Sequence, residues 1–269
     1  KNENIKKYLD TAWTIQLIRG FIISIILFLG APLVGKFFRE PSAISITRVL
    51  AFSELIKSFT HIGVIFFQKN LEFQKQFLYQ ISGTILGLLV SVPAAIIFRS
   101  PWALVCGIIA GDIVKTILSF TIFPLPLSLT LNKKHVKELI NFGKWISLSS
   151  ILLYIITEGD DIFVGRFLGL EQLGYYQMAY QITSAPTTEI THSITSVIFP
   201  AYSKIKNQKD KLKNVHFQIL KLISILTIII SLLIFLFIPT FVSTFLKDKW
   251  LPIIPPLRIL CFFNIARSI

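Results

Sequence analysis

Eight long apolar stretches, separated by short polar connections, constrain the fold of this chain more than any other feature. An α-helix needs about 20 mostly apolar residues to cross a hydrocarbon core roughly 30 Å thick. The stretches cover residues 13–38, 44–67, 77–98, 102–125, 145–167, 173–202, 219–245 and 251–269. Only 15% of the residues are charged and the mean hydropathy is +0.69, whereas soluble domains have about 25% charged residues. We therefore predict an all-α, polytopic membrane protein with about eight transmembrane helices.

The basic residues lie mostly in the connections between these stretches. The formal net charge is +13, from 27 Lys and Arg against 14 Asp and Glu. A nucleic-acid-binding protein gathers such residues on one face, so we expect no nucleic-acid partner. On alternate connections, fourteen Lys stand on one side and six Lys or Arg on the other. Since Lys and Arg in short loops favour the cytoplasm, we expect the basic loops 128–144 and 203–214 to be cytoplasmic.

Part of the sequence is repeated after about two hundred residues. Residues 22–38 and 229–245 share Ile-Ile-Ser, Phe-Leu, Pro and Phe at the same spacing, and Arg-Val-Leu-Ala-Phe at 48–52 is followed by Arg-Ile-Leu-Cys-Phe at 258–262. The first two spans then repeat as the seventh and eighth, a period of six. An even period keeps the orientation, as in transporters with two parallel halves. The chain opens without an initiator methionine and stops within an apolar run, so we expect a longer parent with about twelve spans.

The sixth stretch is unusually polar. Ten of the fourteen residues 183–196 are Ser, Thr, Glu or His, a composition that a lipid-facing helix cannot carry. We favour a helix that lines an aqueous cavity, and the alternative is a helix packed tightly through small residues. The candidate cavity-lining residues are Thr187, Thr188, Glu189, Thr191 and His192. Glu189 and His192 share a helix face, where they either hold a proton or form a structural hydrogen bond.

Four cations in the apolar stretches are candidates for binding an anion: Arg48, Lys57, Lys115 and Arg258. Lys57 follows Glu54 by three residues and Lys115 follows Asp112 by three, so each pair can alternatively offset part of its own desolvation. The arginines that have no acid at helical spacing are better candidates, because a guanidinium binds phosphate oxygens bidentately. They are Arg19, Arg48, Arg258 and Arg267. Snorkelling toward head groups is the competing explanation, strongest for Arg19 and Arg267.

An acidic cluster stands near the end of the fifth stretch, where Glu158, Asp160 and Asp161 precede Arg166. Residue 160 lies 15 residues after Trp145, about 22 Å along a helix and toward the extracytoplasmic mouth. We assign the cluster to coupling or gating, either by neutralising basic residues when the outside closes or by taking up a cation. A local salt bridge is the alternative. The histidines lack metal-ligand spacing and no catalytic constellation stands out, so we expect no metal, no cofactor and no enzyme.

Five segments carry a family resemblance: YLDTAWTIQLIRG (8–20), FQKNLEFQKQ (67–76), FGKWISLSS (142–150), GDDIFVGRFLGLEQLGYYQMAYQI (159–182) and IFPAYSKI (198–205). They resemble bacterial polysaccharide biosynthesis exporters, the repeat-unit flippases of the multidrug/oligosaccharidyl-lipid/polysaccharide exporter superfamily, and 159–182 is the most specific segment. The resemblance implies a MATE-like transporter of 12–14 helices in two lobes. We expect residues 1–127 in the first lobe, a cytoplasmic linker at 128–144, and residues 145–269 in the second lobe.

The resemblance also implies a function. Such a protein moves undecaprenyl-pyrophosphate-linked oligosaccharide across the bacterial cytoplasmic membrane by alternating access, in the lipid bilayer and beside polysaccharide polymerase and chain-length proteins. The sixth stretch would hold the sugar and the four cations the phosphates. A drug/cation antiporter of the same superfamily is an alternative, although a positively charged cavity suits it poorly. A membrane-embedded polysaccharide-assembly enzyme usually has a large loop with catalytic acids, and a scaffold would not need the polar sixth stretch.

Overall fold

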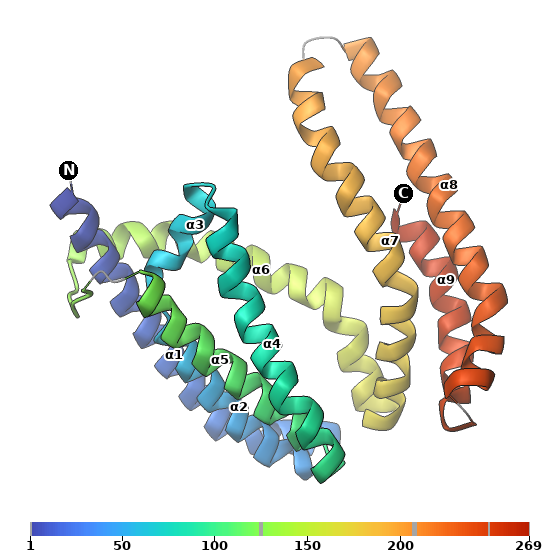
Figure 1. Cartoon of the computed structure of the whole chain (residues 1–269), viewed down its shortest axis with the longest axis horizontal. Helices are drawn as coiled ribbons and strands as arrows, with labels where there is room; N and C mark the ends of the chain where they lie inside the picture. Colours follow the sequence, from blue (N-terminus) through green and yellow to red (C-terminus); the bar gives the residue numbers. More distant parts are fainter. Residues whose placement is uncertain (1, 124–125, 206–208, 247, 269) are drawn as a thin grey trace. The chain divides into compact units, whose positions relative to one another are not determined.

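The structure is a computed structural model that describes residues 2–123, 126–205, 209–246 and 248–268. Within these ranges it does not describe the side chains of residues 2–5, 68, 187, 189–205, 209–211, 245–246 and 268. All regular secondary structure in the described residues is helical, which confirms the all-α class (Figure 1).

The α-helices follow the predicted stretches closely. They are α1 (Asn2–Phe38), α2 (Ser42–Ser58), α3 (Ile65–Lys69), α4 (Phe73–Phe98), α5 (Trp102–Ile122), α6 (Lys133–Phe167), α7 (Leu170–Ile205), α8 (Lys209–Phe241) and α9 (Ile254–Ser268). Two short 3₁₀ segments, η1 (Ile62–Val64) and η3 (Asp248–Ile253), and one π-helical turn, η2 (Val242–Leu246), accompany them.

Six of the described helical segments are long and apolar enough to cross a membrane. They are Lys6–Phe38, Phe73–Phe98, Trp102–Ile122, Lys133–Phe167, Leu212–Thr244 and Asp248–Arg267. Many of their apolar side chains are exposed, for example Ile97 at 73% and Ile156 at 78%, as expected of surfaces that face lipid or further helices rather than water. The prediction of a polytopic membrane protein is therefore confirmed. The predicted spans 44–67 and 173–202 form α2 to α3 and α7, and neither is among these six.

Internal contacts divide the chain into two compact units, Lys1–Thr157 and Glu158–Ile269. In the first unit α1 packs on α2, α4 packs on α5, and α2 also contacts α5. In the second unit α7, α8 and α9 pack on one another (Figure 1). The division between the units falls inside α6, and the lobe boundaries at 127/128 and 144/145 stay predictions.

The antiparallel pair α4 and α5 is joined along a seam of glycines. A Cβ atom on Gly107 would lie 2.7 Å from the carbonyl oxygen of Gly87, and a Cβ atom on Gly111 would lie 2.7 Å from that of Gly83. Small residues four apart on both helices let the two backbones approach this closely, which is how helices associate where no water drives them together.

The second predicted span is interrupted, which corrects the expectation of one continuous helix over residues 44–67. Helix α2 ends at Ser58, and η1 and α3 follow. The Gln16 amide of α1 donates to the carbonyl oxygens of Ser58 (3.0 Å) and Thr60 (2.9 Å), and the His61 N–H donates to the Ser119 hydroxyl of α5 (2.8 Å). Because side chains satisfy these backbone groups, the interruption is tolerated at membrane depth.

The start of the predicted linker is fixed to the first helix. Residues 126–132 have no regular secondary structure, and helix α6 begins at Lys133. The Asp10 carboxylate, 4% exposed, accepts hydrogen bonds from the N–H (3.0 Å) and hydroxyl (2.9 Å) of Ser128. The Thr14 hydroxyl accepts one from the Thr130 N–H (3.1 Å). The segment therefore lies along α1, although the sequence predicted only a basic loop there.

Candidate functional site

Arg48 lies on α2 with its guanidinium over an aromatic ring of α1. The guanidinium carbon is 5.3 Å from the centre of the Phe28 ring, a distance at which a cation is attracted to the ring face. Phe52, one turn farther along α2, meets the same ring edge-on at 6.0 Å and 82°. The Arg48 side chain is exposed, so its donors remain open to a ligand while its position is supported by two aromatic rings.

Arg258 has the same surroundings in the second unit. Its guanidinium carbon lies 5.3 Å from the centre of the Phe235 ring of α8, and Phe262 meets that ring edge-on at 5.7 Å and 70°. The buried neighbours also match, with Ala51 at 0% and Cys261 at 2% exposure. The repeat noticed in the sequence therefore has one local geometry in both units, built on α1 and α2 in one copy and on α8 and α9 in the other.

Lys57 is paired with a carboxylate on a different helix. Its Nζ lies 3.5 Å from Asp112 Oδ2, and the Ser53 hydroxyl donates to the same oxygen. This corrects the predicted i,i+3 pairs, because the partner of Lys57 is Asp112 and neither Glu54–Lys57 nor Asp112–Lys115 is an ion pair among the described side chains. The reason is tertiary: α2 packs on α5, which brings Ser53 and Lys57 toward Asp112.

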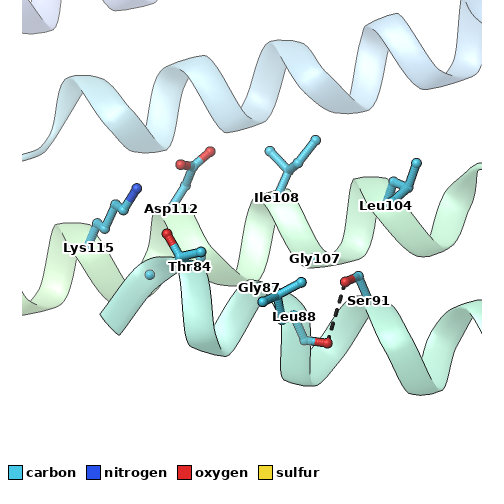
Figure 2. Close-up of a pocket in the computed structure, with 11 residues that line it drawn as sticks. Thr84, Gly87, Leu88, Ser91, Leu104, Gly107, Ile108, Asp112 and Lys115 are labelled. Atoms are coloured by element: carbon cyan, nitrogen blue, oxygen red, sulfur yellow. Dashed lines mark hydrogen bonds between the residues drawn. The ribbon is translucent and has the colours of Figure 1, made fainter. Parts of the chain in front are cut away.

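Lys115 lies at one end of a pocket on the seam between α4 and α5. The pocket has a volume of about 400 Å³, and in Figure 2 Asp112 and Lys115 stand at one end, Leu104 at the other, and Gly87 and Gly107 between them. A Cβ atom on Gly83 would meet the Lys115 side chain, so this glycine gives the lysine its place against α4. Leu88, Leu104 and Ile108 make the rest of the lining largely apolar (Figure 2).

The four candidate cations fall in both units. Arg48, Lys57 and Lys115 belong to the first unit and Arg258 to the second. Arg48 and Lys57 are nine residues apart on α2, about 13 Å along a helix axis. Lys57 and Lys115 both lie next to Asp112, one through the ion pair and one through the adjacent turn of α5. The anion-binding role of the four residues stays a prediction.

The predicted cavity-lining residues lie on α7, and most of them are outside the described side chains. Thr188 is exposed, whereas the side chains of Thr187, Glu189, Thr191 and His192 are not described. At the start of the polar run, Thr183 is buried and its hydroxyl donates to the Ala179 carbonyl (2.9 Å). This beginning of the run is thus packed inside the second unit, and the cavity-lining role of the later residues stays a prediction.

The acidic cluster joins α6 to α7. The Tyr176 hydroxyl donates to Asp160 Oδ2 and the Gln177 amide donates to Asp161 Oδ2, each at 2.6 Å. The chain reverses between the two helices at Gly169, whose φ is +96°, a value that glycine adopts without strain. Both aspartates therefore accept hydrogen bonds from neutral side chains of α7 within a helical hairpin. Glu158 and Arg166 are partly buried in the same segment, and coupling or gating by the cluster stays a prediction.

Sequence reasoning missed the polar partners of these residues. Ser53, Tyr176 and Gln177 do not stand out by composition, because each looks like an ordinary residue of an apolar helix. Each aspartate finds its partner 16 residues later, on the far side of the turn at Gly169, and nothing in the sequence around Asp160 and Asp161 marks these partners.

Fold and site together define a multi-pass, all-α membrane protein with the same local geometry in two copies of one helix pair. A family described as polysaccharide biosynthesis protein matches residues 1–255, and the chain belongs to this family.

Three relatives illustrate the similarity. The lipopolysaccharide biosynthesis protein WzxC of Escherichia coli is 25% identical over 264 residues, 97% of this chain and 54% of the relative. The teichuronic acid biosynthesis protein TuaB of Bacillus subtilis is 22% identical over 269 residues, which are 99% of this chain and 56% of the relative. The probable low-salt glycan biosynthesis flippase Agl15 of Haloferax volcanii is 29% identical over 118 residues, which are 42% of this chain and 24% of the relative. The chain thus spans about half the length of the first two, and no solved structure matches it.

Proposed function

We propose that the full-length protein flips undecaprenyl-pyrophosphate-linked oligosaccharide repeat units across the bacterial cytoplasmic membrane. It does so by alternating access between two lobes, to which residues 1–127 and 145–269 contribute. Family membership supports this proposal, as do the names of relatives that act in lipopolysaccharide and teichuronic acid biosynthesis and of one that is a probable flippase.

The observation that carries the proposal is the pair Arg48 and Arg258. Each is held on a phenylalanine at 5.3 Å within a helix of apolar character. A cation in the hydrocarbon region costs up to about 2.5–3.5 kcal/mol on insertion scales, so the presence of one at matching positions in two copies supports a ligand-binding role. A lipid-linked glycan supplies one, because its pyrophosphate is anionic while its tail can remain in lipid. Lys57 and Lys115 would add to the phosphate site.

The remaining polar residues fit around this site. Thr187, Thr188, Glu189, Thr191 and His192 of α7 would line the cavity that holds the sugar. Glu158, Asp160, Asp161 and Arg166 would gate the extracytoplasmic side, and two of them already bind α7. The basic segments 128–144 and 203–214, which the sequence predicted as loops and which are helical over 133–144, 203–205 and 209–214, would face the cytoplasm, where a polymerase and chain-length proteins of the same assembly could be reached. In this role the protein moves its substrate without changing it.

Reconstitution tests the proposal directly. The full-length protein in liposomes is expected to translocate a fluorescent lipid-linked oligosaccharide, and the double variant Arg48→Gln/Arg258→Gln is expected to lose most of that rate at equal abundance. Lys69→Gln is the matched control, since Lys69 also lies over a ring, that of Phe66 at 5.5 Å, but outside the repeat. Efflux of a cationic dye without translocation of the glycan lipid would instead favour the antiporter alternative.

A further inference from the structure

Arg267 stands on α9 at the position that Lys57 occupies on α2. The shared geometry of the two copies sets this correspondence: Arg48 and Arg258 lie 5.3 Å from the centres of their rings, and the edge-on phenylalanines follow each arginine by four residues. Nine residues after the arginine comes Lys57 in the first copy and Arg267 in the second. Each unit therefore carries two cations at the same spacing on equivalent helices.

From this correspondence we infer that Arg267, together with the Asn264 amide, forms a further binding site for the substrate's phosphate groups. The inference rests on the proposed function, and it names a residue pair that the four-cation phosphate site did not include. In this role Arg267 binds a ligand and does not snorkel toward lipid head groups, the other explanation that the sequence left open.

The second cation of each copy, Lys57 in the first and Arg267 in the second, is held by a neighbouring helix. The two are held in electrostatically different ways. Lys57 pairs with the Asp112 carboxylate of α5. Arg267 donates a hydrogen bond to the Tyr180 hydroxyl of α7 and lies over the same ring, 5.9 Å from its centre. A phenol is neutral, and among the side chains that the structure describes no carboxylate is within ion-pair distance of Arg267. Among the described side chains, a carboxylate thus offsets part of the charge of Lys57 and none offsets that of Arg267.

Asn264 strengthens the contrast between the copies. It stands at the position of Glu54, so an acid in the first copy is replaced by a neutral amide in the second. Asn264 is 3% exposed, and its Nδ2 has no hydrogen-bond partner within the described part of the chain. A buried donor left unpaired is costly. Residues three apart share a helix face, so this donor lies on the side of α9 that also carries Arg267.

A binding experiment on the purified full-length protein tests the site with a defined probe, geranylgeranyl pyrophosphate. Arg267→Gln is expected to weaken binding about 10- to 100-fold, the effect of losing hydrogen bonds to a charged group. The loss should exceed that of Lys57→Gln, because Asp112 already offsets part of the charge of Lys57. Arg267→Lys should retain part of the affinity. Wild-type affinity in Arg267→Gln, or no binding of the probe by the wild type, would overturn the inference.

Two further variants separate a ligand role from a structural one. Tyr180→Phe keeps the ring but removes the hydroxyl, so it should leave probe binding close to wild type. If Tyr180→Phe weakened binding as much as Arg267→Gln, Arg267 would serve to hold α7 and the inference would fail. Lys69→Gln, a ring-supported cation outside the repeat, should bind the probe normally.

Translocation of lipid-linked oligosaccharide in liposomes distinguishes this inference from the proposed function. If the wild type binds the probe through Arg267 but translocates nothing, the proposed function fails and the site stands. If the wild type translocates and Arg267→Gln both binds and translocates normally, the site fails and the proposed function stands.

Discussion

Lys57 of α2 and Asp112 of α5 form an ion pair, with 3.5 Å between Nζ and Oδ2, in a unit whose outer surface is mostly apolar. Asp112 is 8% exposed, and the Ser53 hydroxyl donates to the same carboxylate oxygen. A buried carboxylate needs such partners, because an isolated charge in a low-dielectric interior is strongly disfavoured. The pair therefore joins the α1–α2 and α4–α5 hairpins. It also engages Lys57, one of the candidate phosphate-binding cations, with a carboxylate of the protein itself.

Asp112→Asn separates these two effects. The amide can still accept the Ser53 hydrogen bond but no longer neutralises Lys57, so we expect the free energy of unfolding to fall by about 1–2 kcal/mol. Binding of an isoprenoid pyrophosphate should become tighter at the same time, because Lys57 is released. Thermal unfolding in detergent and probe titration measure the two quantities. The exposed Asp248→Asn is the control, and weaker probe binding in Asp112→Asn would contradict the role assigned to Lys57.

Gln16→Leu should destabilise the interruption after α2. The Gln16 amide donates to two carbonyl oxygens, those of Ser58 and Thr60, and an apolar side chain leaves both without this donor. We expect a loss of about 2 kcal/mol in unfolding free energy, measured by chemical or thermal unfolding in detergent. Gln80→Leu, at an exposed position of α4, should have little effect. Equal stability of the two variants would show that water or another group replaces Gln16.

Gly111→Ala should weaken the packing of α4 on α5. The added Cβ atom would lie 2.7 Å from the Gly83 carbonyl oxygen, so the two backbones must separate, at a cost of about 1–3 kcal/mol as in other overpacked interiors. Gly30→Ala is the matched control, because a Cβ atom on this glycine of α1 meets nothing within 4 Å. Alanine also has the higher helix propensity, so Gly30→Ala should be neutral or stabilising by the same thermal measurement.

Asp10→Ala should release the segment that precedes α6. The carboxylate holds both the N–H and the hydroxyl of Ser128, and losing hydrogen bonds to a charged group shifts a local opening equilibrium by about 10- to 100-fold. Hydrogen exchange followed by mass spectrometry should therefore become faster in peptides that contain Ser128 and Thr130. Glu138→Ala, at an exposed site of α6, serves as the comparison. Unchanged exchange in Asp10→Ala would mean that Thr14 alone suffices to hold the segment.

The positions of the helices could be predicted because the requirement for about 20 apolar residues is local. Helix α4 begins four residues before the predicted Phe77 and ends at the predicted Phe98. The end of α2 at Ser58 could not be predicted in this way, since its hydrogen-bond donor Gln16 lies 42 residues away from Ser58 in the sequence. Local propensity says nothing about such a contact.

The candidate site shows the same division. The repeat was visible in the letters around Arg48 and Arg258, and the structure gives both copies one geometry. The partner of Asp112 was not visible, because i,i+3 spacing pointed to Lys115 while tertiary packing brought Lys57 closer. Spacing rules describe neighbours on one helix, and a buried charge in a helical bundle takes its partner from whichever helix packs against it.

The two hydrogen bonds that straddle Gly169 have a mechanical consequence. They fix the register of α6 against α7, so the last turns of α6 and the first turns of α7 are held together as one hairpin. The preceding turns of α6 carry side chains such as Leu153 (61% exposed) and Ile156 (78% exposed), which have little to brace them within their own unit. We therefore expect α6 to be less constrained just before Glu158 than at the hydrogen-bonded turn that follows.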